Sequence, residues 1–326
     1  HRGPDGMGVW GDEKEKIILG HVRLSILDVS DKGTQPMEYE NKRFHITFNG
    51  EIYNFKDIRQ DLIKLGYNFK SDTDTEVILA AYLHWGTDCV NKFRGMFAFA
   101  LFDKAPKKGS PSLFLARDRM GIKPLLYFKN NNNIFFASEI RALLSTGSVD
   151  RTINKEAILD YFSHGVVYQP NTIIDGIQSL PNGHYLEIFS DGTEKLSRYW
   201  DLHEATIDLR KKIKNIDLDD AVTKLREHLD EATKYCLISD VEIGAFLSGG
   251  IDSTAVVGLM TQVGGKKINT YALGFEDKLS SIDERKFAKI ASDYLNSNHI
   301  GKAKTIDDAK NIFNNIVKEI DQPSID

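Results

Sequence analysis

Leu247–Ser253, with the sequence LSGGIDS, carries the clearest indication of how the second half of the chain folds. It follows an apolar run, Ile243–Leu247, that predicts a short strand, and it precedes a helix predicted from about Ser253. Small residues let a backbone approach a ligand closely, and a helix N-terminus offers N–H groups to an anion. No lysine follows the glycines, unlike in the loop of kinases and GTPases. We therefore expect a phosphate-binding loop; the alternative is a plain strand–helix turn, which would need only one glycine.

Strand and helix patterns alternate around this loop. An amphipathic helix precedes it, and the side expected to be buried carries Val222, Leu225, Leu229 and Ala232. After the loop, Ile268–Phe275 predicts a second strand and Asp283–Tyr294 a further helix. Alternation of this kind indicates right-handed βαβ units and a parallel sheet. The second half is therefore expected to be an α/β domain.

The first two hundred residues are instead rich in short strand patterns. Apolar and polar residues alternate over Phe44–Phe48, as in a half-buried strand, and Ile17–Leu27 and Tyr185–Phe189 look similar. Met96–Phe102 is apolar on both faces, which is typical of a central strand between two layers. This part of the chain is expected to form mainly antiparallel sheet.

Two helices interrupt these strands. They are predicted over Phe55–Gly66, with Asn54 available as the N-cap, and over Asp74–Gly86. Runs of strands with a few helices indicate an α+β domain. A polar stretch after Trp200, with a basic run at residues 211–214, is typical of a linker. We therefore expect domains over residues 1–200 and 217–326, joined by a linker over residues 201–216.

Composition narrows the class of protein. Of the 326 residues, 41% are hydrophobic and 27% charged, which excludes a disordered or collagen-like chain. The formal net charge of −5 argues against general binding of nucleic acid, and no apolar run is long enough to cross a bilayer. Two cysteines, Cys89 and Cys236, allow one disulfide at most, so we expect a reduced, cytoplasmic protein. A start at His1 and an end at Asp326 lead us to expect a fragment of a longer protein.

Several polar residues of the first domain have a plain structural interpretation. Asn49-Gly50 is the strongest short-range signal for a type I′ hairpin, and on these residues alone a hairpin is favoured. Thr73 and Glu76 fit a helix capping box, which would place Asp74 in a first helical turn for local reasons. Arg23 fits a surface position of a strand.

Five further motifs indicate a functional interpretation of the same residues. They stand at residues 1–5 (HRGPD), 21–27 (HVRLSIL), 71–76 (SDTDTE), 96–100 (MFAFA) and 116–125 (ARDRMGIKPL). In this order, with Asn49-Gly50-Glu51 and ahead of LSGGIDS, they closely resemble glutamine-hydrolysing asparagine synthetase. LSGGIDS itself resembles the PP-loop of ATP pyrophosphatases, which cleave ATP between its α and β phosphates. The resemblance extends from His1 to Asp326.

The resemblance implies an N-terminal-nucleophile (Ntn) hydrolase-like αββα domain in the first part of the chain. In that family a chain-terminal cysteine attacks the glutamine amide, and its own α-amine is the base. Asn49 and Gly50 would form the oxyanion hole. Arg23 would pair with the glutamine α-carboxylate, and Asp74, preferred over Asp72, would receive the α-ammonium group. The residues implied to bind glutamine are Arg23, Leu24, Ser25, Ile26, Leu27, Asn49, Gly50, Glu51 and Asp74.

For the second part, the resemblance implies a PP-loop domain with an adenine nucleotide α-hydrolase-like fold. The residues implied to bind ATP are Leu247, Ser248, Gly249, Gly250, Asp252, Ser253 and Leu273. Mg²⁺ would neutralise the triphosphate, with Asp252 as a candidate ligand. The reaction would transfer the amide nitrogen of glutamine to aspartate and give asparagine, glutamate, AMP and pyrophosphate.

The sequence departs from the family pattern at two points. Neither Cys89 nor Cys236 can have a free α-amine, so the nucleophilic cysteine is absent. An acidic Ser-Gly-x-Gly-x-Asp-type loop, expected further along the chain, is absent as well. We therefore expect this piece to be inactive in both half-reactions, whereas the intact parent need not be inactive.

Other interpretations stay open. One is a related amidotransferase with another carboxylate acceptor, and the other is a non-catalytic binding protein of the same fold. The expected partners are glutamine, aspartate and ATP, with a homodimer as one option and no nucleic acid or membrane. Four further polar residues, namely Arg117, Asp118, Lys123 and Glu139, are interpreted as structural or interdomain by default.

Overall fold

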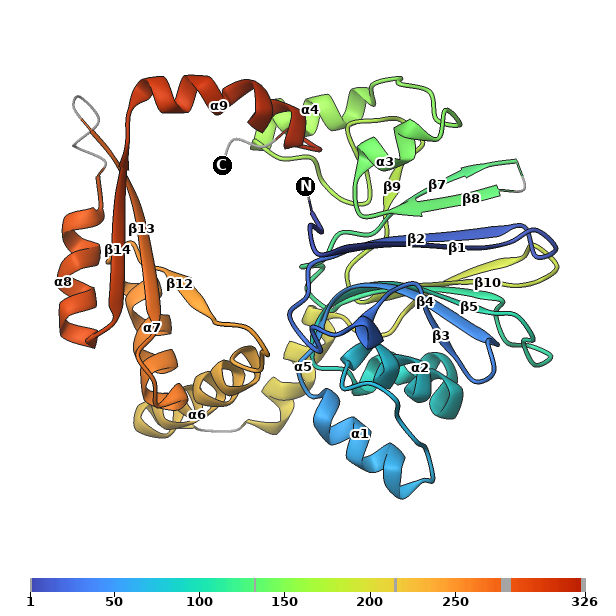
Figure 1. Ribbon diagram of the computed structural model, residues 1–326, viewed down its shortest axis with the longest axis horizontal. Coiled ribbons are helices and arrows are strands. Elements are labelled where there is room, and N and C mark those ends of the chain that lie inside the picture. The colour runs from blue at the N-terminus through green and yellow to red at the C-terminus, as the bar shows by residue number, and fades with distance from the viewer. Residues whose placement is uncertain (1, 132, 214–215, 277–282, 324–326) are drawn as a thin grey trace. The chain divides into compact units, whose positions relative to one another are not determined.

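The computed structural model describes residues 2–131, 133–213, 216–276 and 283–323, which fall into two compact units (Figure 1). The first unit runs to Lys211 and takes up the chain again at Asp321, and the second spans Lys212–Ile320. His1 of the opening motif and Lys214 of the basic run lie outside the described residues.

A six-stranded antiparallel sheet organises the first unit, in the order β11-β10-β6-β5-β4-β3. In that order the strands span Glu194–Arg198, His184–Ile188, Leu113–Arg117, Gly95–Asp103, Phe44–Ile52 and Met37–Tyr39. Strand β5 lies in the middle of the sheet and is buried along most of its length. The prediction of a central strand from the apolar run Met96–Phe102 is confirmed, because layers cover both faces of the sheet.

Helices cover one face of this sheet (Figure 1). They are α1 (Phe55–Lys64) and α2 (Asp74–Trp85), and a 3₁₀ helix, η2 (Gly86–Lys92), continues from α2. Tyr82 of α2 stacks on Phe114 of β6, with ring centroids 5.4 Å apart. Helix α2 is buried over its first nine residues rather than along one stripe.

Two smaller antiparallel sheets cover the other face. One pairs β1 (Gly6–Asp12) with β2 (Ile17–Arg23), and the other has the order β8-β7-β9. Its strands β7, β8 and β9 span Leu126–Asn130, Asn133–Ala137 and Gln178–Ser179. The core between the layers contains Leu19, Ala98, Ala100, Phe102, Leu115, Tyr127 and Leu186.

Helix α3 (Ile140–Ser145) packs on the outside of the smaller sheet, where Ile140 and Leu143 bury themselves against Leu126. The layers therefore follow the order helix, sheet, sheet, helix, which agrees with the αββα arrangement implied by the resemblance. The unit also contains η1 (Asp31–Gly33), α4 (Lys155–His164) and α5 (Leu202–Lys212). Most of the stretch expected to be a linker is thus helical.

Three local expectations for this unit are wrong. Asn49-Gly50 makes no hairpin, because both residues continue β4 and pair with β5. Asn54 precedes α1 without capping it, since its side chain accepts from the Arg94 N–H and donates to the Lys92 carbonyl. His45 is buried, because the β1–β2 sheet covers the polar side of β4 and Trp10 stacks on the imidazole at 3.6 Å.

The second unit contains a parallel sheet with the order β12-β13-β14, over Gly244–Phe246, Asn269–Phe275 and Asn298–Lys304. Its helices are α6 (Leu218–Cys236), α7 (Ile251–Gly264), α8 (Arg285–Leu295) and α9 (Ile306–Glu319). Parallel pairing agrees with the expectation from alternating strand and helix patterns. Leu247, Val257, Ala288 and Ala291 form the small core of the described part of this unit.

The expected burial of α6 is wrong. Val222, Leu225 and Leu229 are 57%, 59% and 43% exposed, because the elements packed on this helix leave its apolar side open. Periodicity placed these residues on one side of a helix, but it could not say what lies against that side. Within the described ranges, no helix combines the length and the apolar character needed to cross a membrane.

Candidate functional site

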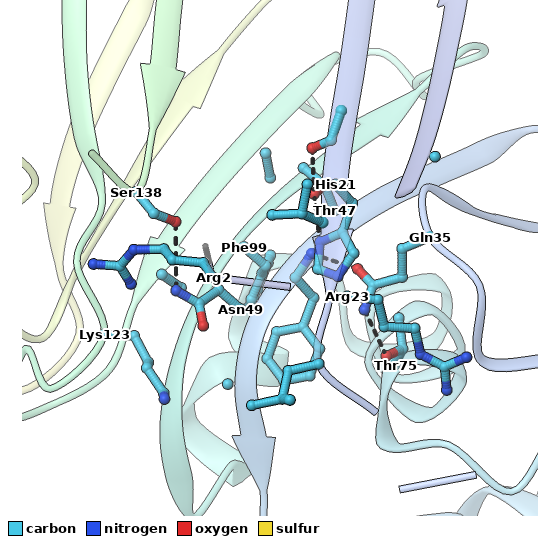
Figure 2. A pocket seen from close by; sticks show the side chains of 18 of the residues that line it. Arg2, His21, Arg23, Gln35, Thr47, Asn49, Thr75, Phe99, Lys123 and Ser138 are labelled. Atoms are coloured by element: carbon cyan, nitrogen blue, oxygen red, sulfur yellow. Dashed lines mark hydrogen bonds between the residues drawn. The ribbon is translucent and has the colours of Figure 1, made fainter. Parts of the chain in front are cut away.

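A pocket of about 830 Å³ lies in the first unit, where β2, β4, the start of α2 and the β8–α3 connection meet. Figure 2 shows its polar side chains, which come from segments far apart in the sequence. Of the residues implied to bind glutamine, all but Ser25 line it. The backbone N–H of Ser25 donates to the Asp5 carboxylate at 2.8 Å instead. These residues alone bring a guanidinium group, a side-chain amide and two carboxylates to the pocket.

Asn49 and Gly50 reach the pocket from the middle of β4. Gly50 has a φ of +147°, and a Cβ there would come within 2.1 Å of the Met96 carbonyl oxygen on β5. A glycine is required because the neighbouring strand passes so close. The Asn49 amide nitrogen donates to the Ser138 hydroxyl at 3.4 Å (Figure 2). That contact holds the amide and leaves its second N–H hydrogen for a ligand oxygen.

Asp74 also lines the pocket, as the first residue of α2. Its carboxylate is buried and accepts from the Ile52 N–H at 2.9 Å. Burial raises the pKa of Asp74 to about 7, and the nearby Glu51 acts in the same direction. Burial also raises the pKa of Glu51, although the Lys123 ammonium opposes that shift. A positively charged ligand group would relieve both carboxylates.

Only half of the expected capping box is present at the start of α2. The Thr73 hydroxyl accepts from the Glu76 N–H at 3.2 Å, as expected for an N-cap. The Glu76 carboxylate, however, accepts from the N–H groups of Lys70 and Ser71. Glu76 thereby fixes the segment that precedes the helix, and with it the position of Asp74 in the first turn. Asp72, the alternative to Asp74, is exposed and pairs with Arg59 at 3.2 Å.

Arg23 lines the pocket at the end of β2. Its guanidinium group donates to the carbonyl oxygens of Leu27, Asp28 and Ser30. The loop after β2 is thus folded around this side chain, which explains how Leu24, Ile26 and Leu27 come to line the same cavity. A carboxylate that approaches Arg23 would meet a guanidinium already fixed in orientation.

Sequence reasoning missed several polar residues of the pocket. They are Arg2, His21, Gln35, Thr47 and Ser138, and Lys123 and Glu139 had been interpreted as structural or interdomain. Burial and the Arg23 charge lower the pKa of His21 to about 4, so its imidazole is neutral. The spacing of two between His21 and Arg23 on one strand gives both the same face and could have indicated it. Nothing local indicates Ser138 or Glu139.

The two cysteines lie elsewhere. Cys89 is buried in η2, where burial raises the pKa of its thiol, and Cys236 is exposed at the end of α6. A raised pKa disfavours the thiolate, which is the nucleophilic form. Neither thiol lines the pocket.

The glycine loop of the second unit connects β12 to α7. Its serines close it: the Ser253 hydroxyl accepts from the Ser248 N–H at 3.3 Å, and the two hydroxyls are 2.9 Å apart. Gly249 has a φ of +84°, and a Cβ there would lie 2.4 Å from the backbone of Phe287 on α8. Gly250 precedes α7 without a side-chain cap, so the first N–H groups of the helix face the loop. These features are suited to the binding of an anion.

The other residues implied to bind the nucleotide lie on three neighbouring segments, namely the chain just after β12, strand β13 and the start of α7. Leu247 is buried and donates its N–H to the Tyr271 carbonyl, while Leu273 on β13 is 59% exposed. Asp252 lies in the first turn of α7. Among the described residues no three His, Cys, Asp or Glu side chains form a group that could hold a metal ion.

The fold and both sites define a two-part protein with an amide- and carboxylate-binding pocket in one unit and a phosphate loop in the other. Residues 1–200 match the family of the glutamine amidotransferase domain, and residues 224–326 match that of asparagine synthase. The first match covers more than half of the chain, so the chain belongs to the glutamine amidotransferase domain family and continues into an asparagine synthase domain.

Named relatives agree with this assignment. A putative glutamine-hydrolysing asparagine synthetase 2 of Methanocaldococcus jannaschii is 37% identical and covers 92% of this chain and 59% of its own. Asparagine synthetase 1 of Bacillus subtilis is 35% identical over 100% of this chain and 49% of its own. A protein of Gibberella zeae named amidase chry2 is 32% identical over 90% and 44%. The chain spans about half the length of the curated relatives it matches.

Proposed function

We propose that the pocket of the first unit binds glutamine and supports hydrolysis of its amide. The observation that carries this proposal is the convergence of Arg23, Asn49 and Asp74 on one cavity from three separate elements. A guanidinium, an amide and a carboxylate complement, in turn, the α-carboxylate, the oxygen of the reacting amide and the α-ammonium group. Glutamine would thus be held at both ends.

The residues then have separate tasks. Arg23 binds the α-carboxylate, and the buried Asp74 receives the α-ammonium together with Glu51. The Asn49 side chain and the Gly50 N–H stabilise the oxyanion that forms when the amide carbon is attacked. Because neither Cys89 nor Cys236 lies at the pocket, we propose that the attacking thiol belongs to a residue outside the printed sequence.

For the second unit we propose a PP-loop fold that binds ATP. Gly249, Gly250 and the start of α7 would receive the phosphate groups, with Ser248 and Ser253 beside them. Asp252 and the phosphates would share Mg²⁺, since Mg²⁺ in such sites is held by few carboxylates together with the substrate's phosphates. Leu247 and Leu273 would contact the adenine.

The protein that contains this chain would then transfer the amide nitrogen of glutamine to aspartate and give asparagine, glutamate, AMP and pyrophosphate. ATP activates the aspartate carboxylate by adenylation, so that AMP leaves when ammonia attacks. A different carboxylate acceptor is the second candidate, since one relative is named an amidase and not an asparagine synthetase. A cytoplasmic location and a homodimer stay predictions.

The proposed reaction is tested by tracing the amide nitrogen of glutamine. Glutamine with a ¹⁵N-labelled amide, ATP and Mg²⁺ are incubated with the protein that contains this chain, with and without aspartate. We expect labelled asparagine and equal amounts of AMP and pyrophosphate only with aspartate. Labelled ammonia and glutamate without any aspartate-dependent pyrophosphate would favour another acceptor. Binding of glutamine with no release of glutamate would favour a non-catalytic protein and contradict the proposal.

A further inference from the structure

Asp321 belongs to the first unit although the residue before it belongs to the second. Its carboxylate accepts from the backbone N–H groups of Ile140 and Arg141 at the start of α3, the latter at 3.2 Å. It also lies 3.7 Å from the Arg141 guanidinium. Glu139 occupies the N-cap position of α3 but makes no capping hydrogen bond. Asp321 therefore takes the role of an N-cap from a segment about 180 positions away.

Gln322 supplies a second attachment. Its side-chain oxygen accepts from the Ile173 N–H at 3.0 Å, on a loop that borders the same core. Helix α3 has only six residues, and a helix this short gains little from its own hydrogen bonds. Its position depends on the burial of Ile140 and Leu143 and on what satisfies its first N–H groups.

The residues at the start of α3 also form part of the wall of the pocket. Ser138 and Glu139 immediately precede the helix and line the cavity. The Ser138 hydroxyl accepts from the Asn49 amide (Figure 2). Glu139 pairs with Arg2 and Arg141. A displacement of the first turn of α3 would move Ser138, and the Asn49 amide would lose the contact that orients it.

We propose that Asp321 and Gln322 are positioning residues for glutamine hydrolysis, because they fix the start of α3 and through Ser138 the oxyanion-binding amide of Asn49. This inference rests on the proposed function of the pocket. It makes the rate of glutamine hydrolysis depend on the segment by which the chain leaves the second unit. The substrate-binding groups Arg23 and Asp74 lie on other elements, so the effect is confined to the oxyanion side.

The test uses the full protein that contains this chain and measures glutamate release. In Asp321→Ala we expect kcat to fall about tenfold while KM for glutamine stays within about twofold, because small misplacement of a catalytic group costs rate rather than binding. Asp321→Asn keeps an oxygen acceptor at the cap and should recover most of the rate. Gln322→Ala should show a smaller loss of the same kind. A general loss of folding would lower the melting temperature and the active fraction in all three.

A double substitution tests whether Asp321 affects the rate through Asn49. In an Asn49→Ala background, Asp321→Ala should change the residual rate less than twofold, because the amide that it positions is gone. The matched control is Asp217→Ala, which removes the carboxylate cap of α6 in the second unit. It should leave glutamine hydrolysis unchanged. Wild-type kcat in a folded Asp321→Ala, or an equal loss in both backgrounds, would overturn the inference alone. A wild-type protein that hydrolyses no glutamine would overturn the proposed function together with it.

Discussion

The Asp74 carboxylate accepts a hydrogen bond of 2.9 Å from the Ile52 backbone N–H, at a place where the carboxylate is buried. The backbone hydrogen bonds to this carboxylate do not offset the loss of water, and the pKa of Asp74 rises to about 7. Near neutral pH, without a cationic ligand group, this carboxyl group therefore populates both protonation states. A cationic ligand group would shift the balance to the carboxylate.

Binding of glutamine should consequently depend on pH. The α-ammonium group requires an ionised Asp74, so KM for glutamine should rise about tenfold for each pH unit below about 7 and level off above it. The measurement is glutamate release from pH 5.5 to 8.5 at several glutamine concentrations. In Asp74→Asn, KM should be high and nearly independent of pH. A wild-type KM that stays constant from pH 5.5 to 8.5 would show that Asp74 does not receive the ammonium group.

The same shift predicts an effect on stability with the opposite sign from the usual surface carboxylate. The pKa of Asp74 is higher in the folded than in the unfolded chain, so its contribution is fully present below about 3.8 and is lost as the pH rises through about 7. Asp74→Asn should therefore raise the free energy of unfolding at pH 8, by up to about 4 kcal/mol, and the gain should shrink towards pH 5.

The matched control for stability is Glu76→Gln, two residues along the same helix. The Glu76 carboxylate accepts from two backbone N–H groups, so its neutralisation should destabilise the protein at pH 8. Chemical denaturation at pH 5 and pH 8 compares the two variants. If Asp74→Asn were destabilising at pH 8, the carboxylate would be better solvated than its burial indicates.

Asn49→Ala should separate the two half-reactions. Loss of one oxyanion donor lowers glutamine hydrolysis by about 10²–10³-fold. Synthesis with added ammonium chloride should keep its wild-type rate, because the amide is not part of the ATP loop. Glutamate release and pyrophosphate release are measured on the same preparation. An equal loss of both rates would contradict the assignment of two sites.

Asp252→Ala should have the reverse effect. Formation of AMP and pyrophosphate should fall below detection, while glutamine hydrolysis persists, because Asp252 lies at the start of α7 beside the glycine loop. Asp293→Ala removes an exposed carboxylate of the same unit that pairs with Lys289 on α8, and it should change neither rate. Unchanged AMP formation in Asp252→Ala would remove this residue from the nucleotide site.

Sequence patterns predicted where strands and helices form, but they predicted less well what packs against each of them. The apolar run Met96–Phe102 identified the central strand, because a strand between two layers must be apolar on both faces. The helix with Val222 and Leu225 was placed correctly and yet its apolar side is exposed. A period of 3.6 residues gives a helix an apolar side and carries no information on its partner.

The candidate site shows the same division. Arg23, Asn49 and Asp74 were found because their motifs resemble a known family, and they share one pocket. The residues that hold them in place were missed: Ser138 contacts Asn49 across 89 positions of sequence, and Asp321 reaches α3 across about 180. Such contacts depend on how two layers meet, and no local pattern encodes them.

Gly249 offers a direct test of the loop geometry, because its neighbour is a natural control. Its φ is +84°, and a Cβ would lie 2.4 Å from the backbone carbonyl carbon of Phe287 and 2.6 Å from the Ala288 nitrogen, neither of which can rotate away. Gly250 has a φ of −69°, and a Cβ there would meet only the Ser248 hydroxyl, at 3.4 Å. We expect Gly249→Ala to lower the free energy of unfolding by about 2–4 kcal/mol and Gly250→Ala by less than about 1 kcal/mol. The comparison is made by denaturation without nucleotide, so that only the approach of α8 to the loop decides it. Equal stability of the two variants would mean that α8 does not pack on Gly249, and the loop would then lack the wall that fixes its backbone for a phosphate group.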